Sequence, residues 1–214
     1  YGAKRKPSKE DLKAVDLLIY DSQDVGCRFY TNINVLARLM EACEENDLEL
    51  LILDRPNPNG YLIDGPVLDM KYKSGIGQFP LPMFPLTVFG SPAYKGIYSF
   101  SFTPKSIKGM SLAPLFMDQK CFGLDLRDYD TDLLRKTGQI NLKWIMELYK
   151  NSPEKEKFFD GSLSNQMNNI EIQIGSGLFR QQIIDGVPES EIRASWEPGL
   201  SNYKSMRKQY LLYP

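Results

Sequence analysis

The sequence contains no histidine and only three cysteines among its 214 residues. Without histidine the chain cannot form a Ser-His-Asp triad, a Cys-His pair or a histidine-ligated zinc site. The cysteines, Cys27, Cys43 and Cys121, are odd in number and far apart, so we expect packed thiols rather than disulfides or metal ligands. Any acid–base chemistry must come from carboxylates, tyrosine, lysine or cysteine, and we expect no metal and no cofactor.

The sequence also has little net charge and no long apolar run. Its net charge of −1 gives no long-range field that would attract nucleic acid, so we expect no nucleic-acid partner. No apolar run approaches the roughly 20 residues of a membrane helix, and the first residues lack the apolar stretch of a signal peptide. Hydrophobic residues make up 42% and charged residues 25%, a composition that indicates a globular protein.

The first part of the chain predicts a βαβ unit. A helix start at Ser8 precedes nearly continuous apolar runs at residues 15–20 and 48–53, and between the runs apolar residues recur at helical spacing over residues 33–43. Such runs are typical of parallel strands that are covered on both faces. The crossover should be right-handed, so both strands should end at the same edge of the sheet.

The rest of the chain predicts a different organisation. Residues 75–92 are rich in Gly and Pro and contain no third βαβ unit, and the segment 88–89 is too short to complete a parallel sheet. Further elements are expected as strands at 98–102 and 121–126 and as helices at 142–149, 178–185, 188–196 and 198–211. We therefore predict an α/β domain over residues 1–83 and a smaller α+β domain with a helical end over residues 84–214.

Polar residues follow each of the two predicted parallel strands. Ligands of open α/β sheets bind beyond the carboxyl ends of the strands, and neighbouring strands lie only ~4.8 Å apart, so Asp21 and Asp54 should approach each other. One interpretation is a cleft for a hydroxyl-rich ligand, in which Arg28 or Arg55 pairs with an anionic substituent. The alternative is structural: Asp21 and Asp24 cap the next helix, and Arg55 forms an ion pair with one of them. Spacing alone leaves both open.

Longer motifs give the sequence a resemblance to a known family. The first two are Asp21-x-Gln23-Asp24-x-Gly26-x-Arg28-x-Tyr30-Thr31 and Leu53-Asp54-Arg55-Pro56-Asn57-Pro58-x-Gly60, followed by Asp64-Gly65-Pro66, Phe79-Pro80-Leu81-Pro82, Phe89-Gly90-Ser91-Pro92, Gly123-Leu124-Asp125-Leu126, Glu191-Ile192-x-x-Ser195-Trp196 and Arg207-x-x-Tyr210-Leu211-Leu212-Tyr213. Together they resemble the exo-β-N-acetylmuramidases of the NamZ type over nearly the whole chain.

The resemblance implies a Rossmann-like domain, a smaller C-terminal domain and an active site between them. It implies a glycoside hydrolase that releases terminal N-acetylmuramic acid from the non-reducing end of peptidoglycan fragments during cell-wall turnover, in the periplasm or outside the cell. The sugar substrate is the expected partner. The candidate catalytic residues are Asp21, Asp24 and Asp54. The candidate substrate-binding residues are Gln23, Arg28, Tyr30, Arg55, Asn57, Asn59 and Asp64.

The sequence departs from the family pattern in two places. The family's Glu-His-Gly motif, which carries its favoured catalytic acid, has no match here, and neither does a long family segment that would fall between Met83 and Phe84. We therefore hypothesise that residues are lost at that junction, and that this chain is an incomplete and inactive family member. The alternative function is a non-catalytic carbohydrate-binding or structural protein that uses the same polar residues.

Overall fold

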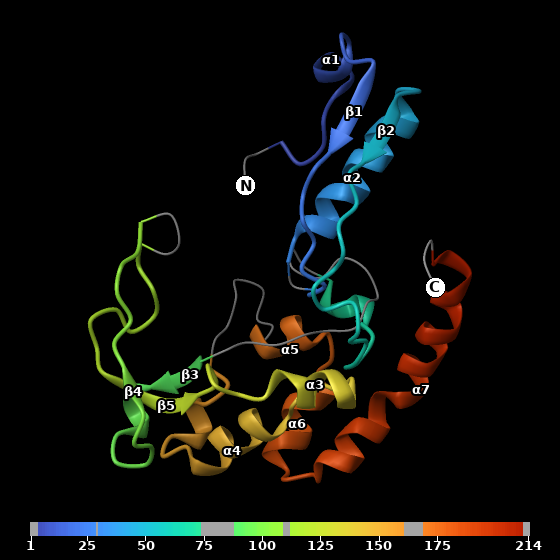
Figure 1. Ribbon diagram of the computed structural model, residues 1–214. Helices are drawn as coiled ribbons and strands as arrows, with labels where there is room; N and C mark the ends of the chain where they lie inside the picture. Colours follow the sequence, from blue (N-terminus) through green and yellow to red (C-terminus); the bar gives the residue numbers. More distant parts are fainter. Residues whose placement is uncertain (1–3, 29, 74–87, 109–111, 161–168, 212–214) are drawn as a thin grey trace.

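The protein mixes helices with two small sheets. The computed structural model describes residues 4–28, 30–73, 88–108, 112–160 and 169–211 (Figure 1). In the view of Figure 1 the N-terminal elements lie together at one end, most helices of the second half lie at the other, and the second sheet lies beside those helices. The predicted boundary at residues 83 and 84, and the Met83–Phe84 junction, fall outside the described residues.

The predicted βαβ unit is confirmed. After the short helix α1 (Lys9–Leu12) come strand β1 (Leu17–Tyr20), helix α2 (Asn32–Glu45) and strand β2 (Glu49–Ile52). The two strands pair in parallel, from Leu17 opposite Glu49 to Tyr20 opposite Ile52. Both strands therefore end at the same edge, and the loops that follow them leave the sheet side by side.

The prediction that both faces of these strands are covered is wrong for the described residues. Ile19 is 54% exposed and Leu51 is 46% exposed, while Tyr20 is the one buried residue of the two strands. The apolar runs predict a layer on each face. The described part of this region instead has two strands with α2 packed against β2, and such an arrangement leaves apolar side chains in contact with solvent.

A second sheet is antiparallel and has the strand order β3-β5-β4. It consists of β3 (Val88–Ser91), β4 (Ser101–Phe102) and β5 (Cys121–Asp125). Residues 88–89 thus belong to a longer strand in a separate sheet, and the strand expected at 98–102 is shorter than predicted and pairs with β5. Gly90 permits this pairing, because a Cβ there would lie 2.5 Å from the carbonyl oxygen of Phe122.

Helices form the remainder of the described second half. They are α3 (Thr131–Thr137), α4 (Lys143–Asn151), α5 (Asn169–Ile174), α6 (Leu178–Ile184) and α7 (Glu189–Arg207), with short 3₁₀ turns at Met70–Tyr72, Pro92–Tyr94, Lys155–Lys157 and Lys208–Tyr210. The predicted break at Pro198 is wrong, because α7 continues through it. Trp196 and Leu200 are buried on either side of the proline, so packing stabilises the helix on both sides of it.

The hydrophobic core lies among these helices and recruits residues from the N-terminal part. Ile192, Leu200 and Phe179 are almost completely buried, and Cys27 and Leu62 belong to the same cluster. The two last residues come from the loops that follow β1 and β2, so the core fixes those loops beside α7. All three cysteines are free and buried, as expected for packed thiols. No helix in the described ranges is long and apolar enough to cross a membrane.

Candidate functional site

A pocket of about 210 Å³ lies where the loops after β1 and β2 meet α7. We call it the rim pocket, and we call the loops that follow β1 and β2 the first and second rim loops. It is lined by Asp24, Gly26, Cys27, Arg28, Ile33, Asn57, Gly60, Leu62, Ile63, Asp64, Tyr203 and Arg207. Of the ten residues proposed from the sequence, the structure brings Asp24, Arg28, Asn57 and Asp64 to this pocket. The others, Asp21, Gln23, Tyr30, Asp54, Arg55 and Asn59, are not among the lining residues.

The two loops are tied directly to each other. The Asn59 side-chain amide donates to the carbonyl oxygen of Val25 at 2.7 Å, and that of Gln23 donates to the carbonyl of Pro56 at 3.3 Å. Gly26 makes the closest approach, since a Cβ there would lie 2.5 Å from Oδ1 of Asn57, and its φ of +69° is one that L residues rarely adopt. Gln23 and Asn59 thus have structural contacts within the rim, beside the ligand contacts predicted for them.

The rim carboxylates differ in their contacts. Asp24 lines the pocket, and its Oδ1 accepts a hydrogen bond from the backbone N–H of Gly26 at 2.6 Å. Asp21 is exposed and forms an ion pair with Arg55, which is the contact that the structural interpretation expects. Asp54 is exposed at the end of β2. The parallel strands therefore deliver Asp21 and Asp54 to one edge, but of these three carboxylates Asp24 is the one that lines the cavity.

Arg28 is buried inside the protein. Its guanidinium donates to the backbone carbonyls of Pro66 at 2.9 Å and Gln173 at 2.8 Å, and also to that of Ile174. Burial lowers the pKa of Arg28 to about 10, so the side chain still carries its charge at neutral pH. Arg28 therefore joins the first rim loop to the C-terminal end of α5. It also lines the pocket, and its contact with a ligand stays a prediction.

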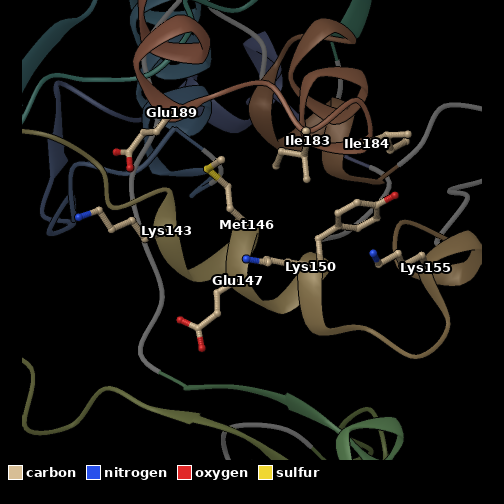
Figure 2. Close-up of a pocket in the computed structure, with 10 residues that line it drawn as sticks. Lys143, Met146, Glu147, Lys150, Lys155, Ile183, Ile184 and Glu189 are labelled. Carbon is tan, nitrogen blue, oxygen red and sulfur yellow. The ribbon is translucent and has the colours of Figure 1, made fainter. Parts of the chain in front are cut away.

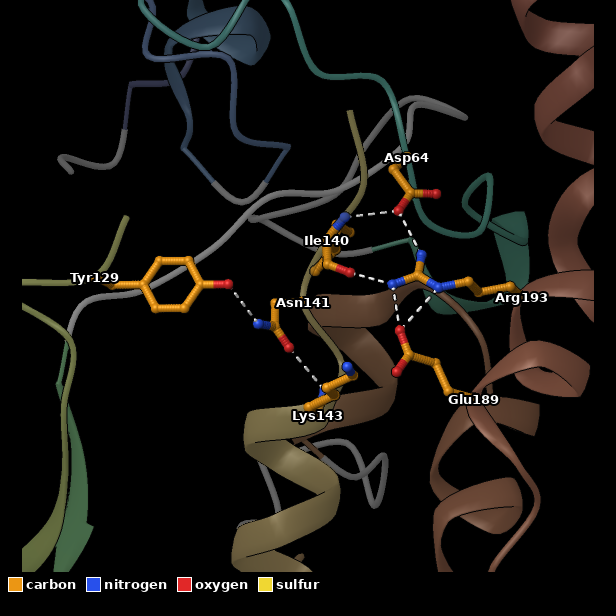
Figure 3. A network of polar contacts seen from close by, with 7 residues as sticks. All are labelled: Asp64, Tyr129, Ile140, Asn141, Lys143, Glu189 and Arg193. Carbon is orange, nitrogen blue, oxygen red and sulfur yellow. Dashed lines mark hydrogen bonds and ion pairs between the residues drawn. The ribbon is translucent and has the colours of Figure 1, made fainter. Parts of the chain in front are cut away.

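Asp64 belongs to a buried polar network that connects the rim to α7 (Figure 3). It accepts from the backbone N–H of Ile140 at 2.7 Å and from Nη1 of Arg193 at 2.9 Å. Arg193 also donates to the carboxylate of Glu189 at 2.7 Å, one turn earlier on α7, and to the carbonyl of Ile140. Asp64 thus has an ion-pair partner within the protein, and this contact supports the wall of the pocket.

Sequence reasoning missed three residues around the pocket. Arg193 lies 129 residues from Asp64, so no local pattern connects the two. Tyr203 and Arg207 were expected within a helix but not at the site. The usable signal is their spacing, because residues four apart lie on the same face of a helix.

Tyr30 and Asn57 complete the set of predicted binding residues. Tyr30 is exposed between the first rim loop and α2. Asn57 lines the pocket, and its Oδ1 also accepts from the backbone N–H of Asn59 at 2.9 Å. The side-chain oxygen of Asn57 therefore accepts a hydrogen bond within the second loop, and the residue also lines the cavity.

A second, larger cavity of about 540 Å³ lies away from the rim loops (Figure 2). Met146, Ile183 and Ile184 give it an apolar lining between α4 and α6. Figure 2 shows Lys143, Glu147, Lys150, Lys155 and Glu189 around these apolar side chains. None of the polar residues that follow β1 and β2 lines this cavity. In the described ranges no three His, Cys, Asp or Glu side chains are grouped as a metal site would require.

Both halves of the chain are similar in sequence to known proteins. The profile described as exo-beta-N-acetylmuramidase NamZ, N-terminal, matches residues 1–91, and the corresponding C-terminal profile matches residues 83–213. Peptidoglycan beta-N-acetylmuramidase NamZ of Bacillus subtilis (strain 168) is 50% identical over 84 residues, which are 39% of this chain. The matched part spans only 20% of that relative's length.

Two solved structures are similar in fold. A DUF1343 family protein from Bacteroides fragilis NCTC 9343 superposes with a TM-score of 0.86 at 30% identity, over 97% of this chain and 78% of that chain. A second DUF1343 family protein from the same organism gives a TM-score of 0.67 at 19% identity, over 100% of this chain and 79% of that one. The arrangement of the described elements is therefore one that solved proteins adopt.

Proposed function

This chain belongs to the exo-β-N-acetylmuramidase NamZ family, and we propose on that premise that its rim pocket binds a terminal N-acetylmuramic acid of peptidoglycan fragments. The observation that carries the proposal is the convergence of three elements on one polar pocket: the loop after β1, the loop after β2 and the end of α7. Its amide and carboxylate groups suit sugar hydroxyls, and an arginine in its lining suits the acidic substituent of this sugar.

The proposed reaction is hydrolysis of the β-glycosidic bond at the non-reducing end. Most glycosidases use two carboxyl groups ~5–10 Å apart, one of which protonates the leaving oxygen. The motif that carries the family's favoured acid has no match in this chain. We propose that Asp24 supplies one carboxyl group of such a pair, because it lines the pocket and forms no ion pair within the described residues. The release assay described below decides between this role and an inactive chain. Asp21 and Asp54 are proposed as nearby carboxylates that orient the substrate.

The proposal extends to the setting of this reaction. We propose a Rossmann-like N-terminal domain over residues 1–83 and a smaller α+β domain over residues 84–214, with the rim pocket between them. A peptidoglycan substrate favours action in the periplasm or outside the cell, in cell-wall turnover. The family membership and the 50% identity to a peptidoglycan β-N-acetylmuramidase support this setting.

Release of a chromophore from an aryl N-acetylmuramide tests the hydrolase. We expect Asp24→Ala to lower kcat/KM at least about 100-fold, because general acid–base groups contribute that much. Asp54→Ala should have a smaller effect. Asp16→Ala is the matched control, since Asp16 is an exposed aspartate that precedes β1 and lies away from the pocket. Equal activity of Asp24→Ala and Asp16→Ala would refute the assignment.

The non-catalytic alternative is favoured by one specific observation. Of the two carboxylates that line the pocket, Asp64 is buried in its ion pair with Arg193, so Asp24 alone faces the cavity unpaired within the described residues. A single carboxylate suits ligand binding better than two-carboxylate hydrolysis. This alternative predicts that N-acetylmuramic acid binds without turnover, which calorimetry together with the release assay would reveal.

A further inference from the structure

We propose that Arg207 determines the specificity of the rim pocket by binding the carboxylate of the sugar's lactyl group. The inference rests on the proposed function and deepens it, because it assigns the acid-recognising group to α7 rather than to the two arginines that the motifs suggest. Tyr203, one turn earlier on the same face of α7, supplies the adjoining aromatic wall.

The contacts of the other arginines exclude them from this role. The Arg28 guanidinium is buried and donates to the backbone carbonyls of Pro66, Gln173 and Ile174. Arg55 is paired with Asp21 and does not line the pocket. Releasing Arg28 would leave buried carbonyl groups without donors, which costs more than a new contact would return.

Arg207 has the opposite surroundings. It lines the pocket, is half-buried, and forms no ion pair with a carboxylate in the described part of the chain. A guanidinium at the edge of a cavity is only partly hydrated, and its planar donors match a carboxylate in two parallel hydrogen bonds. Of the arginines that line the pocket, Arg207 is therefore the one that can bind an acid without breaking existing contacts.

The position of Tyr203 suits a sugar ring that packs beside the carboxylate bound by Arg207. Tyrosine presents an apolar ring face on which the C–H groups of a sugar can pack. Residues four apart on a helix have side chains roughly 5–6 Å apart at their Cβ atoms. A sugar ring against Tyr203 would thus place a substituent within reach of Arg207.

Calorimetric titration with two sugars tests the assignment. N-acetylmuramic acid and N-acetylglucosamine differ only by the lactyl group, so the ratio of their affinities measures recognition of its carboxylate. We expect the unmodified chain to prefer N-acetylmuramic acid, and Arg207→Gln to lower that preference roughly 10- to 100-fold without weakening N-acetylglucosamine. Tyr203→Leu should weaken both sugars by the same factor.

The matched control is Lys208→Gln. Lys208 is the exposed neighbour of Arg207, and its replacement removes the same charge without touching the pocket. Far-ultraviolet circular dichroism of each variant checks that α7 remains folded. The control should retain the full preference, which separates a local contact from a general loss of positive charge.

Each outcome bears on one of the two proposals. Retention of the preference in Arg207→Gln would overturn the role of Arg207 and leave the sugar site standing. Equal binding of both sugars by the unmodified chain would overturn recognition of the carboxylate while supporting a sugar site. Failure of the unmodified chain to bind either sugar would overturn the proposed function, and the assignment of Arg207 with it.

Discussion

The apolar side chains of the βαβ unit and those of the helical region have opposite surroundings. In the helical region Ile192 is 0% exposed and Leu200 is 1% exposed, and both pack in one cluster with Phe179. In the βαβ unit Ile19 is 54% exposed although it stands in the middle of a strand. Residues of similar hydrophobicity therefore contribute very differently to stability in the two regions.

The difference shows which region of the described chain buries its own apolar surface. Burial of apolar area stabilises a protein by roughly 25 cal/mol per Å². The helices bury a cluster of apolar side chains against one another and against the rim loops, so this region gains most from that energy. The two strands and α2 leave much of their apolar surface to solvent, which is typical of surfaces that contact further protein. The rim pocket lies at the boundary and depends on the helical side.

The largest expected effect comes from matched truncations in the two regions. Ile192→Ala should lower the free energy of unfolding by about 2–5 kcal/mol, because it leaves a cavity in a packed cluster. Ile19→Ala removes the same atoms from an exposed position and should cost less than about 1 kcal/mol. Urea denaturation followed by circular dichroism measures both. Equal losses at the two positions would contradict the comparison.

The next effect concerns the ion pair that joins the rim to the helices. Arg193→Met should destabilise the chain by about 3–5 kcal/mol, because it leaves the Asp64 carboxylate buried without a cation. Asp64→Asn in the same background should recover part of the loss. The control is Lys105→Met, which breaks the exposed pair with Asp118 and should cost at most about 1 kcal/mol. Thermal unfolding that is unchanged in Arg193→Met would show that α7 does not support the rim.

Local sequence patterns predicted the elements better than their partners. The βαβ unit and its parallel pairing follow from two apolar runs around a helical period, and the structure has both. The second sheet could not be foreseen, because β3 pairs with β5 across more than thirty residues and no local signal specifies that pairing. Pro198 was misread for a related reason: a proline disfavours a helix locally, but the burial of Trp196 and Leu200 outweighs that cost.

The same limit applies to the site. Asp24, Arg28 and Asn57 were expected at one edge because they follow parallel strands, and Asp64 was a candidate through the family resemblance; all four line one pocket. The sequence did not reveal that Arg28 donates to carbonyls near the end of α5, about 145 residues away. Side-chain chemistry indicates that a buried arginine or aspartate needs partners, but only the folded structure identifies them.

A smaller effect distinguishes backbone strain at a glycine from the close approach of the two rim loops. Gly26 and Gly186 have the same φ of +69°, but a Cβ at Gly26 would meet Asn57 whereas one at Gly186 would meet nothing within 4 Å. Both alanine variants should lose about 1 kcal/mol through strain. Gly26→Ala should in addition displace Asn57 and weaken sugar binding, which titration would detect. Identical behaviour of the two variants would show that the approach of the two loops is unimportant.

The smallest effect compares a carboxylate of the N-terminal region with one of the second sheet, which lies beside the helices. Lys4 and Ser8 lower the pKa of Asp11 to about 2, and Arg127 lowers the pKa of Asp125 to about 2. A lowered pKa means that each carboxylate favours the folded state above its ordinary pKa of 3.8 and loses that contribution as pH falls toward 2. NMR titration should find both pKa values low while the chain is folded. Leu12 is the one buried residue of α1, so we expect acid to unfold α1 before the rest of the chain. The loss of stability at low pH should therefore be reduced more by Asp125→Asn than by Asp11→Asn. The reverse order would mean that the N-terminal region is the better anchored of the two.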